Sequence, residues 1–404
     1  MEWKTMRQTI AGRMGMIFVL PLLGGCGVDY AYIFPQIAGQ AGILLHSIPL
    51  SEAVRSSNLS DEERAKLVLI RDVRNYAGRE MSLVTADTYT LFYDGGEGAL
   101  AYNISASHRH EFRPKKWEFP IIGVIPYLGF FDKAAAVRKF DELQAQGYDV
   151  FMYEVDAYST LAYFPNPVYS PMLRRSDLSL IDTVIHELLH GTVWHAGDTT
   201  FNESLATFVG RTGAVEFLAD HYPDEPEHLG AALEHYEDVD LYNTFIFELY
   251  DELEAFYSSD LTDEEKIARR EAVYQAGRER FADVYQPVMN APQDYDWIVD
   301  LPANNAWMLA NRRYNYNTDV FAQVYDATGR DWANTIGVFR SAATAKDPNE
   351  YLAEWLAEYE ELTPALPKHR AGGNSDPGQS TDSPEPIQRG LCPHTSCLVR
   401  PIPR

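Results

Sequence analysis

The sequence predicts an α+β fold in which short strands precede a pair of helices that carry two histidines and a glutamate. Segments with the composition of strands lie between residues 89 and 164, whereas residues 178–285 mostly show the apolar spacing of helices. The chain has 404 residues, of which 46% are hydrophobic, and it can therefore bury a large core. We predict one folded domain over residues 27–363, preceded by a signal segment and followed by a tail.

The first half of this domain alternates helices with strands. A helix is expected over 33–48, and Ser60-Asp-Glu-Glu63 has the form of a capping box that starts a second helix. A third helix is expected over 132–147. Runs rich in β-branched and aromatic residues predict strands over 89–93, 100–105, 120–126, 148–155 and 158–164. Asp94-Gly95-Gly96 predicts a turn between the first two strands.

The second half is mostly helical. From Leu229 to about Tyr285 the chain is charged but carries an apolar stripe, which predicts two antiparallel helices joined near Ser258-Ser259. Thr262-Asp-Glu-Glu265 has the form of a second capping box and starts the second of these helices. We interpret 229–285 as a helical hairpin inserted into the domain, with a structural role or as a cover over a cleft.

Residues 186–190 read His-Glu-Leu-Leu-His within an apolar run that has helical spacing. On a helix, His186 and His190 lie one turn apart on the same face, where both imidazoles reach one metal ion. Glu187 adjoins the first ligand, at the position from which a carboxylate reaches a water on the metal. The pattern predicts a zinc site. The alternative is a core helix that carries histidines, with Glu187 as a solvated charge.

A third ligand is expected from a second helix that begins near Phe201. Glu203 falls in its first turn, thirteen residues after His190, and the segment 196–199 supplies a tight turn between the two helices. Three protein ligands leave one coordination position open, which is typical of catalytic zinc rather than structural zinc.

Other histidines form weaker metal patterns. His195 competes as a third ligand, but the metzincin spacing requires histidine at 196 and glycine at 193, where this chain has Ala196 and Val193. His108 and His110 form a His-x-His pair with no adjacent third ligand, and we interpret them as part of a solvated loop.

The N-terminus has the form of a bacterial lipoprotein signal. Three basic residues precede the apolar stretch 14–23, and Leu23-Gly-Gly-Cys26 resembles a lipobox. We predict that residues 1–26 are a signal peptide and that Cys26 is lipidated. A short transmembrane anchor with a coincidental cysteine is the alternative. Gly27 favours the outer membrane over retention at an inner membrane.

Charge and composition limit the partners. The net charge of −25 repels phosphates and excludes nucleic acid as a partner. The two remaining cysteines, Cys392 and Cys397, are able to close a small disulfide loop in an oxidising compartment. The segment 364–404 is rich in proline, glycine, serine and charge, which predicts a disordered tail.

Taken together, the metal motif, the lipobox and the middle region resemble a bacterial lipoprotein family of predicted aminopeptidases of the gluzincin type. The resemblance spans roughly residues 20–345 and is most specific in the metal helices. It is carried by Cys26, Gly39-Gln40, Phe119-Pro120, 157–161, 186–190, 201–208, Asn304-Asn305-Ala306 and Tyr314. It implies a zincin-like (gluzincin) metallopeptidase fold with additional helices. The segment 162–167 departs from the family's pattern, which has two aspartates there.

The predicted function is a zinc-dependent peptidase that acts on peptides or proteins, and the resemblance implies aminopeptidase activity. His186, His190 and Glu203 hold Zn²⁺, which activates a water, and Glu187 is the general base. Tyr314 is the candidate oxyanion donor, because tyrosine is common in such sites and its segment resembles the family's.

Two rival functions stay open. A zinc endopeptidase of envelope proteins would have the same metal ligands and would differ in which part of the peptide it binds. A non-catalytic envelope-binding lipoprotein is disfavoured by Glu187, because a structural metal site needs no base. Asp182 and Asn202 are candidates for orienting the ligands. The expected location is the cell envelope, where a lipid anchor holds the protein on the periplasmic face of the outer membrane.

Overall fold

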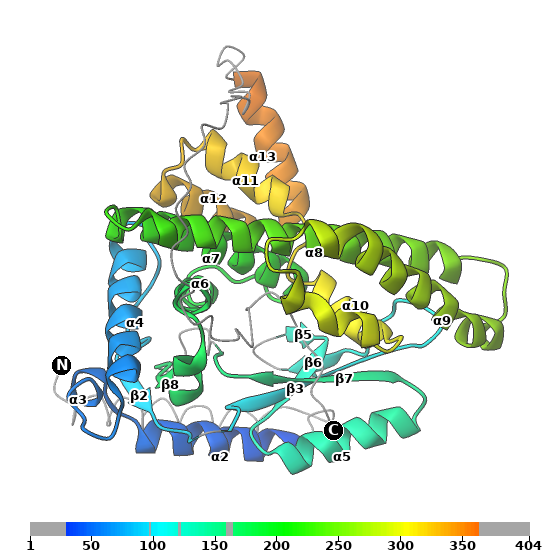
Figure 1. The fold of residues 1–404 in the computed structure, drawn as a ribbon, viewed down its shortest axis with the longest axis horizontal. Helices are drawn as coiled ribbons and strands as arrows, with labels where there is room; N and C mark the ends of the chain where they lie inside the picture. Colours follow the sequence, from blue (N-terminus) through cyan, green and yellow to red (C-terminus); the bar gives the residue numbers. More distant parts are fainter. Residues whose placement is uncertain (1–29, 97, 120–122, 159–164, 363–404) are drawn as a thin grey trace, which may run out of the picture.

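The computed structural model (Figure 1) describes residues 30–96, 98–119, 123–158 and 165–362. The predicted signal peptide with Cys26 and the predicted tail with its two cysteines lie outside the described residues. Within the described residues, no helix is both long enough and apolar enough to cross a membrane. The described chain combines many helices with short strands, which confirms the predicted α+β class.

The largest sheet has the strand order β6-β3-β7 and is antiparallel throughout. Its strands are β3 (Ala101–Ser107), β6 (Tyr127–Phe130) and β7 (Asp149–Val155). In this register, Ile104 of β3 lies opposite Leu128 of β6. The central position of β3 leaves β6 and β7 as the outer strands of this sheet, as far as the structure describes it.

Helices cover both faces of this sheet (Figure 1). α5 (Lys133–Ala145) packs against β3 and β7 from one side, and α10 (Asn305–Arg312) packs against the same two strands from the other. Six of the seven residues of β3 are buried as a result. This strand therefore lacks the alternation of buried and exposed residues that a one-sided sheet would show.

Two smaller sheets complete the described strands. β2 (Leu91–Tyr93) pairs antiparallel with β1 (Ile48–Pro49) and parallel with β8 (Val168–Tyr169). β4 (Trp117–Phe119) pairs antiparallel with β5 (Gly123–Ile125).

The N-terminal helices are α2 (Tyr30–His46), α3 (Leu50–Ala53) and α4 (Asp61–Arg79). Ser60 caps α4, because its side chain accepts the backbone N–H of Glu63 while the Glu63 carboxylate accepts the backbone N–H of Ser60. This reciprocal pair confirms the first predicted capping box.

The helices that carry the metal motif lie at the centre of the molecule (Figure 1). A 3₁₀ segment, Ser170–Arg174, leads into α6 (Asp177–His190), and α7 (Thr199–His221) follows after a short loop. α6 packs against both α4 and α7. α7 starts two residues earlier than predicted, so Glu203 lies at the fifth position of the helix and not in the predicted first turn.

The predicted helical pair is present as α8 (Pro226–Tyr257) and α9 (Asp263–Arg280), and the two helices pack together. Thr262 forms the second predicted capping box with Glu265. The chain then continues through a π-helical turn, Phe281–Tyr285, and two 3₁₀ segments, Gln286–Val288 and Pro292–Asp300. Three further helices, α11 (Thr318–Ala327), α12 (Trp332–Thr344) and α13 (Pro348–Leu362), stand above α7 in Figure 1.

The strand predictions hold for the longer strands and are incomplete elsewhere. A turn does follow β2 near Asp94-Gly95-Gly96, but β2 and β3 join different sheets and do not pair. Only Gly123–Ile125 of the predicted strand 120–126 is described as a strand. Most of the predicted strand 158–164 lies outside the described residues.

Candidate metal centre

α6 places the two motif histidines side by side. The helix is capped by the Ser176 side chain, which accepts the backbone N–H of Ser179. His186 and His190 follow near its C-terminal end, and their Nε2 atoms lie 3.1 Å apart. Only 5% of His186 and 7% of His190 is exposed, so both imidazoles face the interior of the protein.

α7 brings a carboxylate to the same point. Gly197 has a φ of +93°, which a side chain would strain, and this turn lets the chain reverse after α6. Asp198 then caps α7 by accepting the backbone N–H of Phe201. Glu203 Oε2 lies 3.4 Å from His186 Nε2 and 3.6 Å from His190 Nε2.

The three side chains have a spacing that suits a zinc ion. Zinc binds nitrogen and oxygen at about 2.0–2.1 Å in tetrahedral geometry, which places neighbouring ligand atoms roughly 3.4 Å apart. The three distances in this group, 3.1, 3.4 and 3.6 Å, bracket that value. The donor set of two imidazoles and one carboxylate is also a catalytic zinc set. The residues therefore fit the predicted metal.

Electrostatics keep Glu203 ionised within this group. Burial alone would raise its pKa, but hydrogen bonds from His186 and His190 outweigh burial and hold the pKa well below its usual range. For His186, burial opposes the charged form, yet the hydrogen bond to Glu203 and the neighbouring Glu187 raise its pKa. The site thus holds its negative charge in the interior, where a bound cation would be stabilised.

Glu187 lies beside this group and outside the ligand triangle. Burial raises the pKa of its carboxyl, and the nearby histidines offset part of that shift. Its Oε2 atom is buried and has no hydrogen-bond partner among the described residues. A carboxylate in this environment is able to accept a proton readily, because burial weakens its solvation.

The candidates for orienting the ligands have different roles. Asn202 holds the loop between the helices, since its amide donates to the carbonyl of His195 and its Oδ1 accepts the His195 N–H. Asp182 is buried on α6, accepts the Tyr236 hydroxyl at 3.4 Å and raises the pKa of His186 through its charge.

His195 is turned away from the metal group. Its Nδ1 lies 3.0 Å from the carbonyl oxygen of Ala343 in α12. Among the described residues, the buried group of potential ligands contains His186, His190 and Glu203 without His195. This agrees with the sequence-based preference for Glu203 as the third ligand.

Sequence reasoning missed a glycine that sets the distance between α6 and α7. A Cβ atom on Gly210 would lie 2.3 Å from Asp182 Oδ1, 3.1 Å from the Asp182 backbone oxygen and 3.4 Å from His186 Cβ. Only glycine fits at this contact, so Gly210 lets α7 approach the helix that carries the histidines. The available signal was a glycine within a run of helical spacing, where glycine is otherwise unfavourable.

Tyr314 approaches the metal group from the segment after α10. Its ring centroid lies 6.4 Å from that of His186. The segment is fastened to α7 by Ser204, whose hydroxyl donates to the Arg313 carbonyl and accepts the Tyr316 N–H. Ser204 directly follows Glu203, so the same turn of α7 places the ligand and the tyrosine.

Two more tyrosines join Tyr314, and sequence reasoning did not select them. Tyr127 starts β6, and Tyr153 of β7 is hydrogen-bonded to Tyr314. Burial and then the Glu203 carboxylate raise the pKa of both Tyr127 and Tyr314 well above the usual value. These phenols therefore stay protonated and are able to donate hydrogen bonds. No sequence pattern linked them, because the three lie on separate elements.

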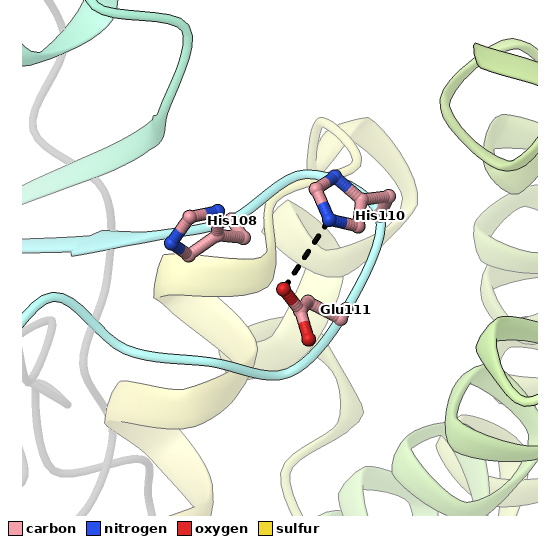
Figure 2. A group of neighbouring side chains, drawn as sticks. All are labelled: His108, His110 and Glu111. Carbon is pink, nitrogen blue, oxygen red and sulfur yellow. Dashed lines mark ion pairs between the residues drawn. The ribbon is translucent and has the colours of Figure 1, made fainter. Parts of the chain in front are cut away.

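Figure 2 shows a second group of potential ligands in the loop after β3. His110 Nε2 lies 3.2 Å from Glu111 Oε1 and 3.6 Å from Asp263 Oδ2. His108, His110 and Glu111 lie close enough together to share an ion, and all three are half-buried. The expectation that this pair had no adjacent third ligand was wrong, because Glu111 directly follows His110.

Comparison with protein-family models places the chain in a family. The family model described as "Putative aminopeptidase" matches residues 31–353. A search of curated proteins and a search of solved structures each found no match. Since the family match covers most of the chain, this protein belongs to that family.

Proposed function

We propose that this member of the aminopeptidase family is a zinc-dependent peptidase with a gluzincin-like active site and fold. The observation that carries the proposal is the buried triangle of His186, His190 and Glu203 with Glu187 beside it. Family membership supports a peptidase role on independent grounds. Exopeptidase specificity from the N-terminal end of the substrate is part of the proposal.

In this proposal His186, His190 and Glu203 hold the zinc ion. When bound, zinc supplies an acidified water and polarises the scissile carbonyl. Metal binding requires an ionised carboxylate and neutral imidazoles, and the lowered pKa of Glu203 suits the first requirement.

Glu187 moves the protons. Its buried carboxylate takes a proton from the attacking water and delivers it to the amine that leaves. The raised pKa of Glu187 suits both steps, because a stronger base accepts the proton more readily and the resulting acid returns it.

Tyr314 donates to the oxygen on which negative charge develops. Its raised pKa keeps the proton on the phenol, and Ser204 fixes the segment that carries it. Tyr127 lies in the same electrostatic environment, since Glu203 and Glu187 raise its pKa as well. Tyr127 also starts β6, an outer strand of its sheet as described, and an extended peptide pairing with β6 would pass beside the metal group.

Metal analysis combined with substrate digestion tests this function. The soluble protein from residue 27 onward is purified and incubated with a peptide library whose N-termini are free or acetylated. We expect hydrolysis of free N-termini, loss of activity with chelator and recovery with zinc. If acetylated peptides are cleaved at internal bonds, the protein would be an endopeptidase and not an aminopeptidase. If the zinc-loaded protein cleaves no peptide, the non-catalytic envelope protein is the alternative that stands.

We also propose that Cys26 is lipidated and anchors the enzyme in the cell envelope, on the periplasmic face of the outer membrane. The supporting pattern is Leu23-Gly-Gly-Cys26 after an apolar stretch. Metabolic labelling with a fatty-acid probe should mark the wild type and leave a Cys26→Ser variant unlabelled. Equal labelling of the two proteins would contradict the anchor.

A further inference from the structure

Arg313 is a buried cation that forms no ion pair with a described residue. Only 4% of the residue is exposed, and its Nη1 atom has no hydrogen-bond partner. Among the described residues no carboxylate forms an ion pair with its guanidinium. Burying an unpaired charge is strongly unfavourable, so this arrangement needs a reason.

The other buried arginines show what a compensated charge looks like in this protein. Arg270 is also 4% exposed, and its Nη1 and Nη2 donate to the two oxygens of Asp149 at 2.5 and 2.7 Å. Arg278 donates to Glu271 at 2.5 Å and to the carbonyl of Leu301 at 2.6 Å. Arg313 differs from both, because its guanidinium faces the Tyr127 ring and forms no ion pair with a described carboxylate.

The surroundings of Arg313 place it at the active site. Its guanidinium carbon lies 5.4 Å from the centre of the Tyr127 ring. Its charge acts on Tyr127, Tyr153 and Tyr314, in each case lowering a pKa that burial raises. Ser204, next to the ligand Glu203, binds the Arg313 carbonyl. The cation therefore lies beside Tyr127 and directly precedes Tyr314, two of the tyrosines near the proposed metal group.

Glu203 is not the missing partner. Its Oε2 atom lies 3.4 Å from His186 Nε2 and 3.6 Å from His190 Nε2, and among the described residues it forms no ion pair with Arg313. A guanidinium presents a fork of N–H donors that matches a carboxylate, and this match is the usual reason for an arginine inside a binding site.

We propose that Arg313 binds a carboxylate of the peptide substrate. The inference rests on the proposed peptidase function and deepens it by naming the substrate class: peptides that carry a negative charge close to the scissile bond. That charge has two sources, the terminal α-carboxylate of a short peptide or the side chain of an acidic residue. The unpaired guanidinium would then be neutralised only when substrate is present.

Binding measurements on an inactive protein test this proposal. The zinc-loaded Glu187→Gln variant is titrated by calorimetry with three peptides: Leu-Ala-Ala as the free acid, Leu-Ala-Ala amide and Leu-Asp-Ala amide. We expect the free acid, the aspartyl peptide or both to bind about 10- to 100-fold more tightly than the uncharged amide, as a charged hydrogen-bonded pair implies. The peptide that binds more tightly than the uncharged amide identifies the source of the carboxylate.

The matched variants are Arg313→Met and Arg312→Met, each added to Glu187→Gln. Arg312 is the control, because it stacks 4.0 Å from the Tyr250 ring and belongs to no described ion pair. Arg313→Met should abolish the preference for the charged peptide, while Arg312→Met should keep it. Equal binding of all three peptides, or a preference that survives Arg313→Met, would overturn the proposal.

Thermal melting separates a binding role from a structural one. An unpaired buried cation contributes no ion-pair stability, so Arg313→Met should melt at or above the temperature of its parent. Arg270→Met should melt well below it, because it removes the guanidinium that binds both oxygens of the buried Asp149 carboxylate. A large fall in the melting temperature of Arg313→Met would mean that the cation has a structural role. Failure of the wild type to hydrolyse any peptide would refute the peptidase function, but the binding preference would still report on Arg313.

Discussion

Two groups of the same composition, two histidines and one glutamate, differ in almost everything that surrounds them. His186, His190 and Glu203 are buried and come from two long helices that pack together. The group of His108, His110 and Glu111 is half-buried and comes from one loop. Both groups place potential metal ligands close together. Proximity alone therefore does not distinguish a catalytic site from a surface cluster.

The difference lies in the charges next to each group. Arg113 donates to the surface group, with Nη2 at 2.6 Å from Glu111 Oε1 and 3.4 Å from His108 Nδ1. This cation already satisfies the carboxylate and repels a metal ion. In the buried group, no arginine or lysine among the described residues forms an ion pair with Glu203, whose partners are the two histidines. We therefore expect the buried group alone to hold zinc.

Removing ligands from each group should give the largest contrast. Purified wild type should carry about one zinc per chain, and His186→Ala or Glu203→Ala should carry almost none. His108→Ala and His110→Ala are the matched controls and should keep the wild-type content. Elemental analysis after dialysis measures both. Zinc that persists in Glu203→Ala, or disappears in His108→Ala, would reverse the assignment of the two groups.

Tyr314→Phe should give the next largest effect. It removes one donor to the developing negative charge, which typically lowers kcat by about 10²–10³. Zinc content should not change, because Tyr314 is not a ligand. Tyr316→Phe is the control, since Tyr316 stacks against Arg312 and its backbone N–H binds Ser204. Equal kcat values for Tyr314→Phe and wild type would remove Tyr314 from the mechanism.

A smaller effect is expected from the packing that holds the buried group. Gly210→Ala places a methyl group 2.3 Å from Asp182 Oδ1 and 3.1 Å from a backbone oxygen, and should lower stability by about 1–3 kcal/mol and weaken zinc binding. At Gly213 the nearest atoms, at 2.4 and 2.8 Å, belong to the flexible end of Met81. Gly213→Ala should therefore be milder. Denaturant unfolding and zinc titration of both variants measure these effects. Equal losses of stability and zinc affinity in the two variants would contradict this prediction.

The smallest effect is expected on the surface. His110 pairs with Glu111 and Asp263, whose side chains are 40% and 60% exposed, and solvent-accessible ion pairs contribute little. His110→Gln should change the free energy of unfolding by less than about 0.5 kcal/mol. A change above about 2 kcal/mol in urea titration would show that this loop is more than a solvated cluster.

Local patterns in the sequence predicted the parts of the site that depend on neighbours along the chain. The spacing of His186 and His190 predicted their common helix face, and Ser60 and Thr262 predicted helix starts that the structure confirms. Glu203 followed from its place after a turn. These features need only one or two adjacent elements.

Features that depend on distant segments were not predictable from the same patterns. β2 pairs with β8, about 75 residues later, and not with β3 across the nearby turn. Arg313 reads in the sequence as an ordinary charge, and only its burial without an anion singles it out. Tyr127 and Tyr153 join Tyr314 because β6 and β7 meet the segment after α10. Such contacts are set by tertiary packing, which local spacing does not encode.

The most direct test of the central claim is the Glu187→Gln variant. Glu187 is not a ligand in this account, so zinc content and melting temperature should stay near wild type. Glutamine cannot accept a proton from water, and peptide hydrolysis should fall by about 10²–10⁴ or more, since the same group also serves as the acid. Near-normal hydrolysis by the zinc-loaded variant would contradict the mechanism. Loss of zinc together with activity would instead place Glu187 among the ligands.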